Sequence, residues 1–162
     1  MTSGRFVLAT TAALAALGAL LSGAGCGNEA PCTDCPAVEG RYQLSFPDAG
    51  VSSDCTRLGI TGLPQGADLE VSRNGNSLTG TLEGVSLLGS VTASGGFALG
   101  GTQANVDAGR TDTLNLAGRT QPLGADGGMV GLEGTFTASY SNPGAGGQQN
   151  CALNSPFTAT RR

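Results

Sequence analysis

The cysteines are the residues of this chain with the most chemistry open to them. Cys32 and Cys35 form a Cys-x-x-Cys motif, which can act as a redox dithiol or as half of a zinc site. A redox motif needs the N-terminus of a helix after a strand, and the Pro-containing flanks offer neither. A zinc site needs two further ligands, but Cys55 and Cys151 stand far apart and the chain has no His. We therefore expect all four cysteines to form structural disulfides.

The pairing of these cysteines stays open at the level of sequence. Four cysteines allow three connectivities, and the sequence does not choose among them. The pairing that we favour is Cys55 with Cys151 inside a domain and Cys32 with Cys35 in the segment before it. The long loop closed by Cys55 and Cys151 would constrain the unfolded chain by a few kcal/mol.

The hydroxyl groups of the chain lack a base to activate them. Ser52 and Ser53 stand beside Asp54, and Thr56 stands beside Arg57, but the chain has neither His nor Lys. Nucleophilic catalysis by Ser or Thr needs such a neighbouring base, and a Schiff base needs Lys. We therefore predict a protein that is not an enzyme, with no catalytic residues and no cofactor.

The carboxylates show no ligand or catalytic motif either. Asp107 and Asp112 could be imagined as calcium ligands, but the stretch lacks the alternating acids of an EF-hand loop. The Gly pairs at 95–96, 100–101 and 127–128 are interpreted as turns or bulges, because no Lys and no following helix accompany them. We expect most acids to serve turns or the solvated surface, and no metal site: Asp48, Asp54, Asp68, Glu70, Glu83, Asp107, Asp112, Asp126 and Glu133.

The first 25 residues have the pattern of an export signal. One Arg precedes a run of apolar and small residues from Phe6 to Leu21, which is shorter than the ~20 residues of a transmembrane helix. Ser22 to Gly25 then supply a region of small residues directly before Cys26. We predict a signal-peptide helix over 1–25.

This arrangement resembles the bacterial lipoprotein precursors, whose signal ends in Leu, two small residues and the cysteine that receives the lipid. Ala24, Gly25 and Cys26 match that pattern, and Gly23 stands where the family usually has Leu. The resemblance implies that Cys26 carries diacylglycerol and further acyl chains, palmitate among them, after cleavage before it. It also implies the outer membrane, because Gly27 follows the cysteine where Asp would favour the inner one.

Cysteine counting favours the lipid over two alternatives. Assigning Cys26 to lipid leaves an even set of four cysteines for disulfides in the oxidising periplasm. The alternatives are a free secreted protein, cleaved within the small residues 22–30, and a retained membrane helix. We expect lipid anchoring to the cell envelope, on the periplasmic or the surface face.

The mature chain divides into a tether and a domain. Residues 26–39 carry two Pro and no apolar run, which is typical of a short flexible tether. Without residues 1–25 the chain has 7 Arg against 12 acids, so its net side-chain charge is −5. This dispersed acidic charge argues against nucleic acid as a partner.

Residues 40–162 alternate apolar and polar residues with a period of two, which is typical of half-buried β-strands. Asn74-Gly75 is the strongest hairpin signal among several turns, and no stretch shows a helical period with caps. We predict an all-β domain, an antiparallel meander of about eight or nine strands that closes into a small barrel, with a β-sandwich as the alternative.

A second resemblance concerns this domain. Gly40-Arg41-Tyr42 at the first strand and Phe157 to Arg161 at the last are similar to the calycin-type barrels, the lipocalins and their relatives. Those begin with Gly-x-aromatic and end with an Arg that covers the barrel floor, which implies that Tyr42 and Arg161 meet there.

Two functions therefore compete. One is a lipid-anchored envelope protein whose β domain binds a partner or supports the envelope. The other, implied by the lipocalin resemblance, is a carrier of a small hydrophobic ligand, with space left by the small residues Gly80, Ala98 and Ala138.

Overall fold

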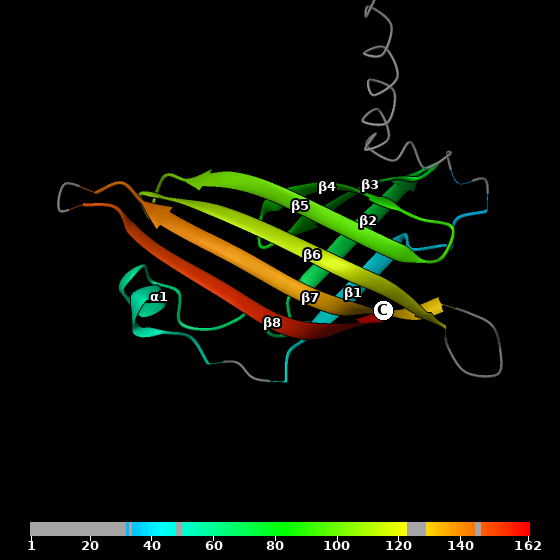
Figure 1. Cartoon of the computed structure of the whole chain (residues 1–162), viewed down its shortest axis with the longest axis horizontal. Helices are drawn as coiled ribbons and strands as arrows, with labels where there is room; N and C mark the ends of the chain where they lie inside the picture. The colour runs from blue at the N-terminus through cyan, green and yellow to red at the C-terminus, as the bar shows by residue number, and fades with distance from the viewer. Residues whose placement is uncertain (1–31, 33, 48–49, 123–128, 145–146) are drawn as a thin grey trace, which may run out of the picture. The chain divides into compact units, whose positions relative to one another are not determined.

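The alternating segments after residue 39 form eight antiparallel strands in the computed structural model, which describes residues 32, 34–47, 50–122, 129–144 and 147–162 (Figure 1). The predicted signal peptide and Cys26 lie outside these residues. The strands are β1 (Gly40–Ser45), β2 (Asp68–Asn74), β3 (Ser77–Leu82), β4 (Val85–Val91), β5 (Gly96–Asn105), β6 (Arg110–Pro122), β7 (Met129–Asn142) and β8 (Gln149–Arg161).

Each strand pairs with the next along the chain, and β1 pairs with β8 to close a barrel. The all-β prediction and the barrel are thereby confirmed, with eight strands. Closure leaves few free strand edges, which protects Thr- and Gly-rich strands against pairing with other chains. The part of β8 before Thr158 has no partner in β1, and Pro156 lies in this part. A Pro, which lacks the backbone N–H, is tolerated on such an edge.

Tight turns set the register of the hairpins. The turn after Asn74 has Gly75 at φ +63°, as the Asn-Gly signal predicts. The turn between β3 and β4 consists of Glu83 and Gly84, and both have positive φ, 51° and 80°. This pattern is that of a type I′ turn, in which Gly or Asn is favoured and Glu is unusual.

The inward positions of the strands fill the centre of the barrel. Tyr42 and Phe136 are among the largest fully buried side chains. The Phe46 ring lies edge-on to Phe136, with 5.4 Å between the ring centres, and it also reaches Phe157 at 6.4 Å. Leu side chains from β2, β3, β4 and β6 complete the core. The near-zero exposure of these inward side chains indicates a closely packed centre.

Glycines on the inward face let the strands approach each other and curve. Gly118 and Gly134 are direct partners between β6 and β7, and a Cβ on either would overlap a backbone carbonyl oxygen of the other strand. A Cβ on Gly101 would likewise overlap the Ser86 carbonyl oxygen. The interpretation of Gly100–Gly101 as a turn or bulge was wrong, because both lie inside β5 and pair regularly with β6. These glycines serve curvature at barrel corners.

The prediction that Gly80, Ala98 and Ala138 leave room for a ligand inside the barrel is not supported at two of these three positions. Ala98 faces the solvent, and a Cβ on Gly80 would lie 2.7 Å from the Glu70 carbonyl oxygen. Ala138 does point inward and is 3% exposed. At Gly80 the neighbouring backbone takes the space that a side chain would occupy.

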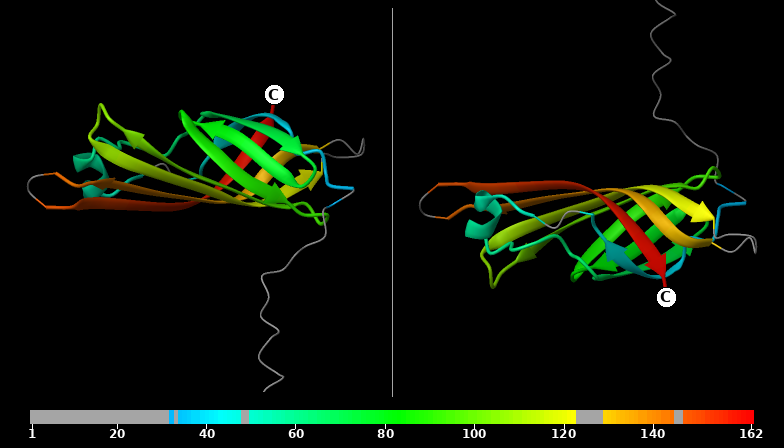
Figure 2. Two further views of the ribbon diagram at one scale, coloured as in Figure 1. Left: turned by 90° about the horizontal axis from the view of Figure 1, so that it is seen from above. Right: turned by 90° about the horizontal axis from the view of Figure 1, so that it is seen from below.

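One short helix, α1 (Ser53–Arg57), interrupts the connection between β1 and β2, although no helical period is visible in this stretch of the sequence. Five residues are too few to display a period, so the pattern could not reveal it. Figure 2 shows α1 beside the first half of β8. Within the described residues, no helix is long and apolar enough to cross a membrane.

Candidate binding site at the α1 end of the barrel

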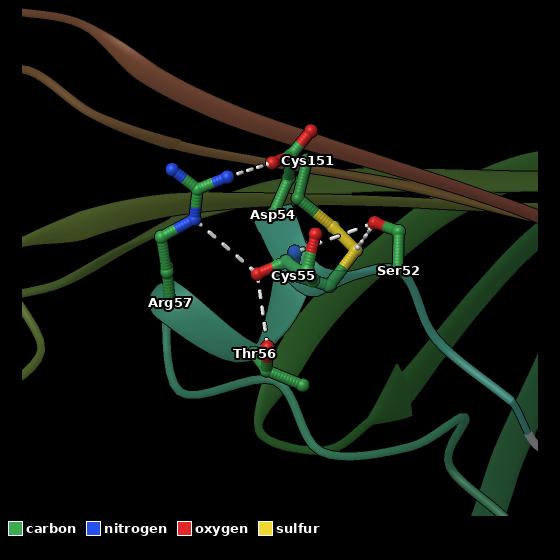
Figure 3. Close-up of polar contacts among 7 residues, drawn as sticks. Ser52, Asp54, Cys55, Thr56, Arg57 and Cys151 are labelled. Carbon is green, nitrogen blue, oxygen red and sulfur yellow. Dashed lines mark hydrogen bonds and ion pairs between the residues drawn. A yellow bond between two sulfur atoms is a disulfide. The ribbon is translucent and has the colours of Figure 1, made fainter.

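The hydroxyl and acidic residues around α1 serve the helix itself (Figure 3). Ser52 is the N-cap, and its Oγ accepts a hydrogen bond from the Cys55 backbone N–H. Thr56 Oγ1 donates to the Ser53 carbonyl oxygen at 2.9 Å. Asp54 and Arg57 form an exposed ion pair one helical turn apart. The residues considered as nucleophiles are thus used in capping and surface pairing.

The cysteines form two disulfides in the described chain, Cys55–Cys151 and Cys32–Cys35, which is the pairing that we favoured. Cys55 and Cys151 join α1 to β8, with 5.0 Å between their Cα atoms (Figure 3). Among the described residues no three His, Cys, Asp or Glu side chains gather as metal ligands. The disulfide positions α1 and the loop that follows it against the end of the long strands.

The residues behind the calycin resemblance are adjacent at the opposite end of the barrel. Tyr42 and Arg161 are direct partners between β1 and β8. Tyr42 is 1% exposed and its hydroxyl donates to the Val38 carbonyl oxygen at 2.9 Å. The Arg161 guanidinium packs on Gly40, where a Cβ would lie 2.8 Å from Nε. Gly40 therefore makes room for Arg161 over this end of the barrel.

An ion pair lies beside them. Arg73 Nε donates to Glu39 Oε2 at 2.9 Å, and Arg73 Nη1 reaches the Cys35 carbonyl oxygen at 3.4 Å. Backbone hydrogen bonding, and then Arg73, lower the pKa of the Glu39 carboxyl against the opposing effect of burial. These contacts lie at the end of the barrel where residues 34–39 join β1, and Val38 of this segment is 1% exposed.

The end near α1 carries a cavity of about 450 Å³. Its rim is the loop of residues 59–65 between α1 and β2, and its walls come from β4, β6 and β7. Gln65 holds the loop to the end of β1, because its Oε1 accepts a hydrogen bond from the Phe46 backbone N–H at 2.8 Å. The lining includes Ile60, Leu63, Glu83, Val85, Arg110, Asp112, Leu114, Phe136 and Tyr140.

A buried ion pair forms one wall of this cavity. Arg110 and Asp112 are two residues apart on β6, and their side chains are only 14% and 13% exposed. Arg110 Nε donates to Asp112 Oδ1 at 2.7 Å and Nη2 donates to Oδ2 at 3.2 Å. Arg110 Nη1 donates to the Leu58 carbonyl oxygen at 2.8 Å, which ties the loop after α1 to the wall. A bidentate pair of this kind holds both side chains in one geometry.

Tyr140 lies directly beside this pair. It is the β7 partner of Asp112, and the Arg110 guanidinium carbon lies 5.5 Å from the centre of its ring. Tyr140 is 7% exposed, and its hydroxyl makes no hydrogen bond to another described residue. Burial, and after it the negative charges of Asp112 and Glu83, raise the pKa of the Tyr140 hydroxyl above its usual value. Tyr140 therefore lines the cavity as a neutral phenol.

The chain matches no protein-family model, and no curated protein and no solved structure is significantly similar to it. The assignment of a function therefore rests on the residues of the cavity.

Sequence reasoning did not single out this site. Asp112 was weighed only as a calcium ligand beside Asp107, and the structure instead pairs it with Arg110. Tyr140 was predicted only as an inward residue of its strand. One feature of the sequence could have revealed the site. Arg110 and Asp112 are charged, yet they occupy the same alternating positions of the strand as the inward Leu114. Charges on the inward face of a strand are costly unless paired, so they mark a site or a strand end.

Proposed function

We propose that this chain is a lipid-anchored protein of the bacterial cell envelope, not an enzyme, whose barrel binds a small molecule in the cavity at its α1 end. The observation that carries the proposal is the cavity of about 450 Å³ with Arg110, Asp112 and Tyr140 held in its wall. Small-molecule sites are clefts of ~300–1,000 Å³ with apolar walls and a few fixed polar groups. This cavity has that size, and polar groups make up the larger part of its accessible lining.

The filled core favours this cavity over a lumen for a hydrophobic cargo. The inward aromatic side chains Tyr42, Phe136 and Phe157 occupy the centre of the barrel, each at most 2% exposed. A lipocalin-like carrier needs an open apolar interior of ligand size. We therefore use the lipocalin resemblance at Tyr42 and Arg161 only for the arrangement of the strands. The proposed ligand site is the cavity at the α1 end.

The lipid anchor is supported by the pattern of residues 1–26 and by the even number of remaining cysteines. The described chain enters the barrel at the end where Glu39, Arg73 and Arg161 lie. In an up-and-down barrel the β1–β2, β3–β4 and β5–β6 connections lie at the other end, and these line the cavity.

The anchor is tested by the intact mass of the protein purified from membranes, compared with a Cys26→Ser variant. We expect a wild-type mass that begins at residue 26 and carries acyl chains, and a variant mass without them. A wild-type protein released without lipid would contradict the anchor, and it would leave the binding proposal standing.

The cavity is tested separately by screening small fragments with amide NMR shifts. We expect hits to shift residues 59–65 and the β6 residues near Asp112. A Thr61→Trp variant places a large ring on the exposed rim of the cavity and should abolish the shifts, whereas Leu88→Trp on the exposed outer face should not. Fragments that cause the same shifts in the Thr61→Trp variant as in the wild type would contradict a site at this end.

A further inference from the structure

The lining of the cavity has an apolar part and a polar part. Ile60 and Leu63 from the loop, Val85 from β4, and Leu114 and Phe136 from β6 and β7 form the apolar part. The polar part of the lining consists of Glu83, Arg110, Asp112 and Tyr140, the last three on the same two strands as Leu114 and Phe136. A ligand that contacts both the apolar and the polar side chains has an apolar body and a polar head. The charges of the polar side chains determine whether a cationic or an anionic head binds better.

The guanidinium of Arg110 is already occupied. Three of its five N–H donors are used by Asp112 and by the Leu58 carbonyl oxygen, and its face lies on the Tyr140 ring. Its charge is balanced by a carboxylate at hydrogen-bond distance. An anionic head would have to compete with that carboxylate inside a site of low exposure, which disfavours an anion.

Glu83 supplies a charge that no Arg balances. It lies on the rim of the cavity and forms no ion pair with another described residue. The cavity is thus lined by Glu83 and Asp112 against Arg110 alone, a net charge of −1. Glu83 also has a φ of 51°, where Asn or Gly would be less strained. A strained residue kept at the rim of a cavity points to a role in that cavity.

Tyr140 adds an oxygen atom without a partner. Its side chain is more than nine-tenths buried, it lines the cavity, and its hydroxyl has no hydrogen bond to a described residue. Tyr140, its strand partner Asp112, and Glu83 thus all bring oxygen acceptors to the lining of the cavity.

We propose that the cavity binds a small organic cation, an amine whose ammonium group donates to Glu83, Asp112 and Tyr140 while its apolar body packs on Leu63, Val85 and Phe136. The inference rests on the proposed binding function and names the class of ligand. An ammonium group brings three donors, which matches the three oxygen acceptors of the lining. It also balances the net charge of the cavity.

The test uses three probes of similar shape and different charge: phenethylamine, phenethyl alcohol and hydrocinnamate. Each is titrated into the mature chain from residue 26 with Cys26→Ser, and affinity is read from the amide NMR shifts of residues 59–65. We expect the amine to bind about tenfold more tightly than the alcohol, because charge-assisted hydrogen bonds exceed neutral ones. Hydrocinnamate should bind most weakly.

Variants separate the charge from the shape of the site. Glu83→Gln should weaken the amine about tenfold and leave the alcohol unchanged, and Tyr140→Phe should weaken the amine by a few fold. Glu70→Gln, at an exposed carboxylate on β2, is the matched control and should change nothing. Glu83→Asn should unfold at an equal or higher temperature while it loses amine affinity, which a purely structural role of Glu83 would not produce.

The outcomes distinguish the two proposals. Equal affinities for the amine and the alcohol would contradict a cationic ligand, and so would an amine affinity that is unchanged by Glu83→Gln. Either result would leave the cavity as a binding site. Tighter binding of hydrocinnamate would do the same. Failure of all three probes to shift residues of the cavity would overturn the cationic class, and failure of the whole fragment screen would overturn the binding site.

Discussion

At the scale of single residues, the pair Arg110–Asp112 shows why a buried charge must keep its partner. Both side chains are about one-seventh exposed, and each is held by the other through two hydrogen bonds. Removing one partner leaves an uncompensated charge in a place that water reaches poorly. The exposed pair Arg57–Asp54, at 68% and 61%, lacks this dependence.

We predict that Asp112→Asn lowers the free energy of unfolding by about 3 kcal/mol, because Arg110 keeps its charge and loses its counterion. Asp54→Asn is the control on the exposed pair and should cost less than about 1 kcal/mol. Urea denaturation followed by circular dichroism measures both. Equal losses in the two variants would show that the buried pair contributes no more than the surface pair.

The two tyrosines predict a loss of stability at alkaline pH. Burial raises the pKa of Tyr42, with Glu39 adding to the shift and Arg161 opposing it, and burial raises the pKa of Tyr140. The folded protein therefore holds both phenol protons more tightly than the unfolded chain does. This stabilisation is fully present below the ordinary pKa of 10.0 and is lost as the pH rises through the folded values.

We expect the unfolding midpoint to fall with pH above about 10, and to fall less steeply in the Tyr42→Phe, Tyr140→Phe double variant. Tyrosinate absorbance of the folded wild type should rise only above the ordinary pKa. Absorbance that rises at the ordinary value would contradict the burial of both hydroxyls.

At the scale of elements, the Cys55–Cys151 disulfide is what holds α1 and its loop at the end of the barrel. It spans 96 residues, whereas Cys32–Cys35 spans 3. The entropy that a disulfide removes from the unfolded chain grows with the length of the closed loop. The two bonds should therefore differ strongly in their effect on stability.

We predict that Cys55→Ser with Cys151→Ser lowers the free energy of unfolding by roughly 3 to 5 kcal/mol. The same change at Cys32 and Cys35 should cost clearly less. Amide hydrogen exchange should accelerate in residues 50–66 of the first variant, because the loop around the cavity loses its attachment to β8. Similar losses in both double variants would contradict the role of loop length.

At the scale of the whole molecule, the barrel is closed around a packed core. The inward side chain of Phe136 is fully buried and contacts Phe46 edge-on. In a carrier with an open lumen, such a residue would line an empty space and its truncation would cost little. In a packed core, truncation leaves a cavity that the neighbours fill only partly.

We therefore predict that Phe136→Ala lowers the free energy of unfolding by about 3 to 5 kcal/mol. Leu88→Ala, at a side chain that is 70% exposed on β4, should change it by less than about 0.5 kcal/mol. Thermal and urea unfolding measure both variants. A loss near that of Leu88→Ala would indicate an open interior and favour the hydrophobic carrier.

The strand pattern was accessible from the sequence because its cause is local. Successive side chains of a strand point to opposite faces, so a period of two predicts the buried face without knowledge of the partner strand. Tyr42, Leu69, Leu116 and Phe157 were placed inward in this way, and all are buried. β4 escaped this pattern, because exposed Leu88 interrupts the alternation.

The sequence by itself determined the all-β class, the alternating core, the Asn-Gly hairpin and the lack of a base for its hydroxyl groups. Only the tertiary structure decided between barrel and sandwich. Closure depends on the pairing of β1 with β8, the first and the last strand in the sequence of the domain. The presence of the cavity and the residues that line it also depend on the tertiary structure. Arg110 meets the Leu58 carbonyl 52 residues away, and Tyr140 on β7 meets Asp112 on the neighbouring strand β6. Contacts of such separation leave no periodic trace, since they are set by strand register and curvature.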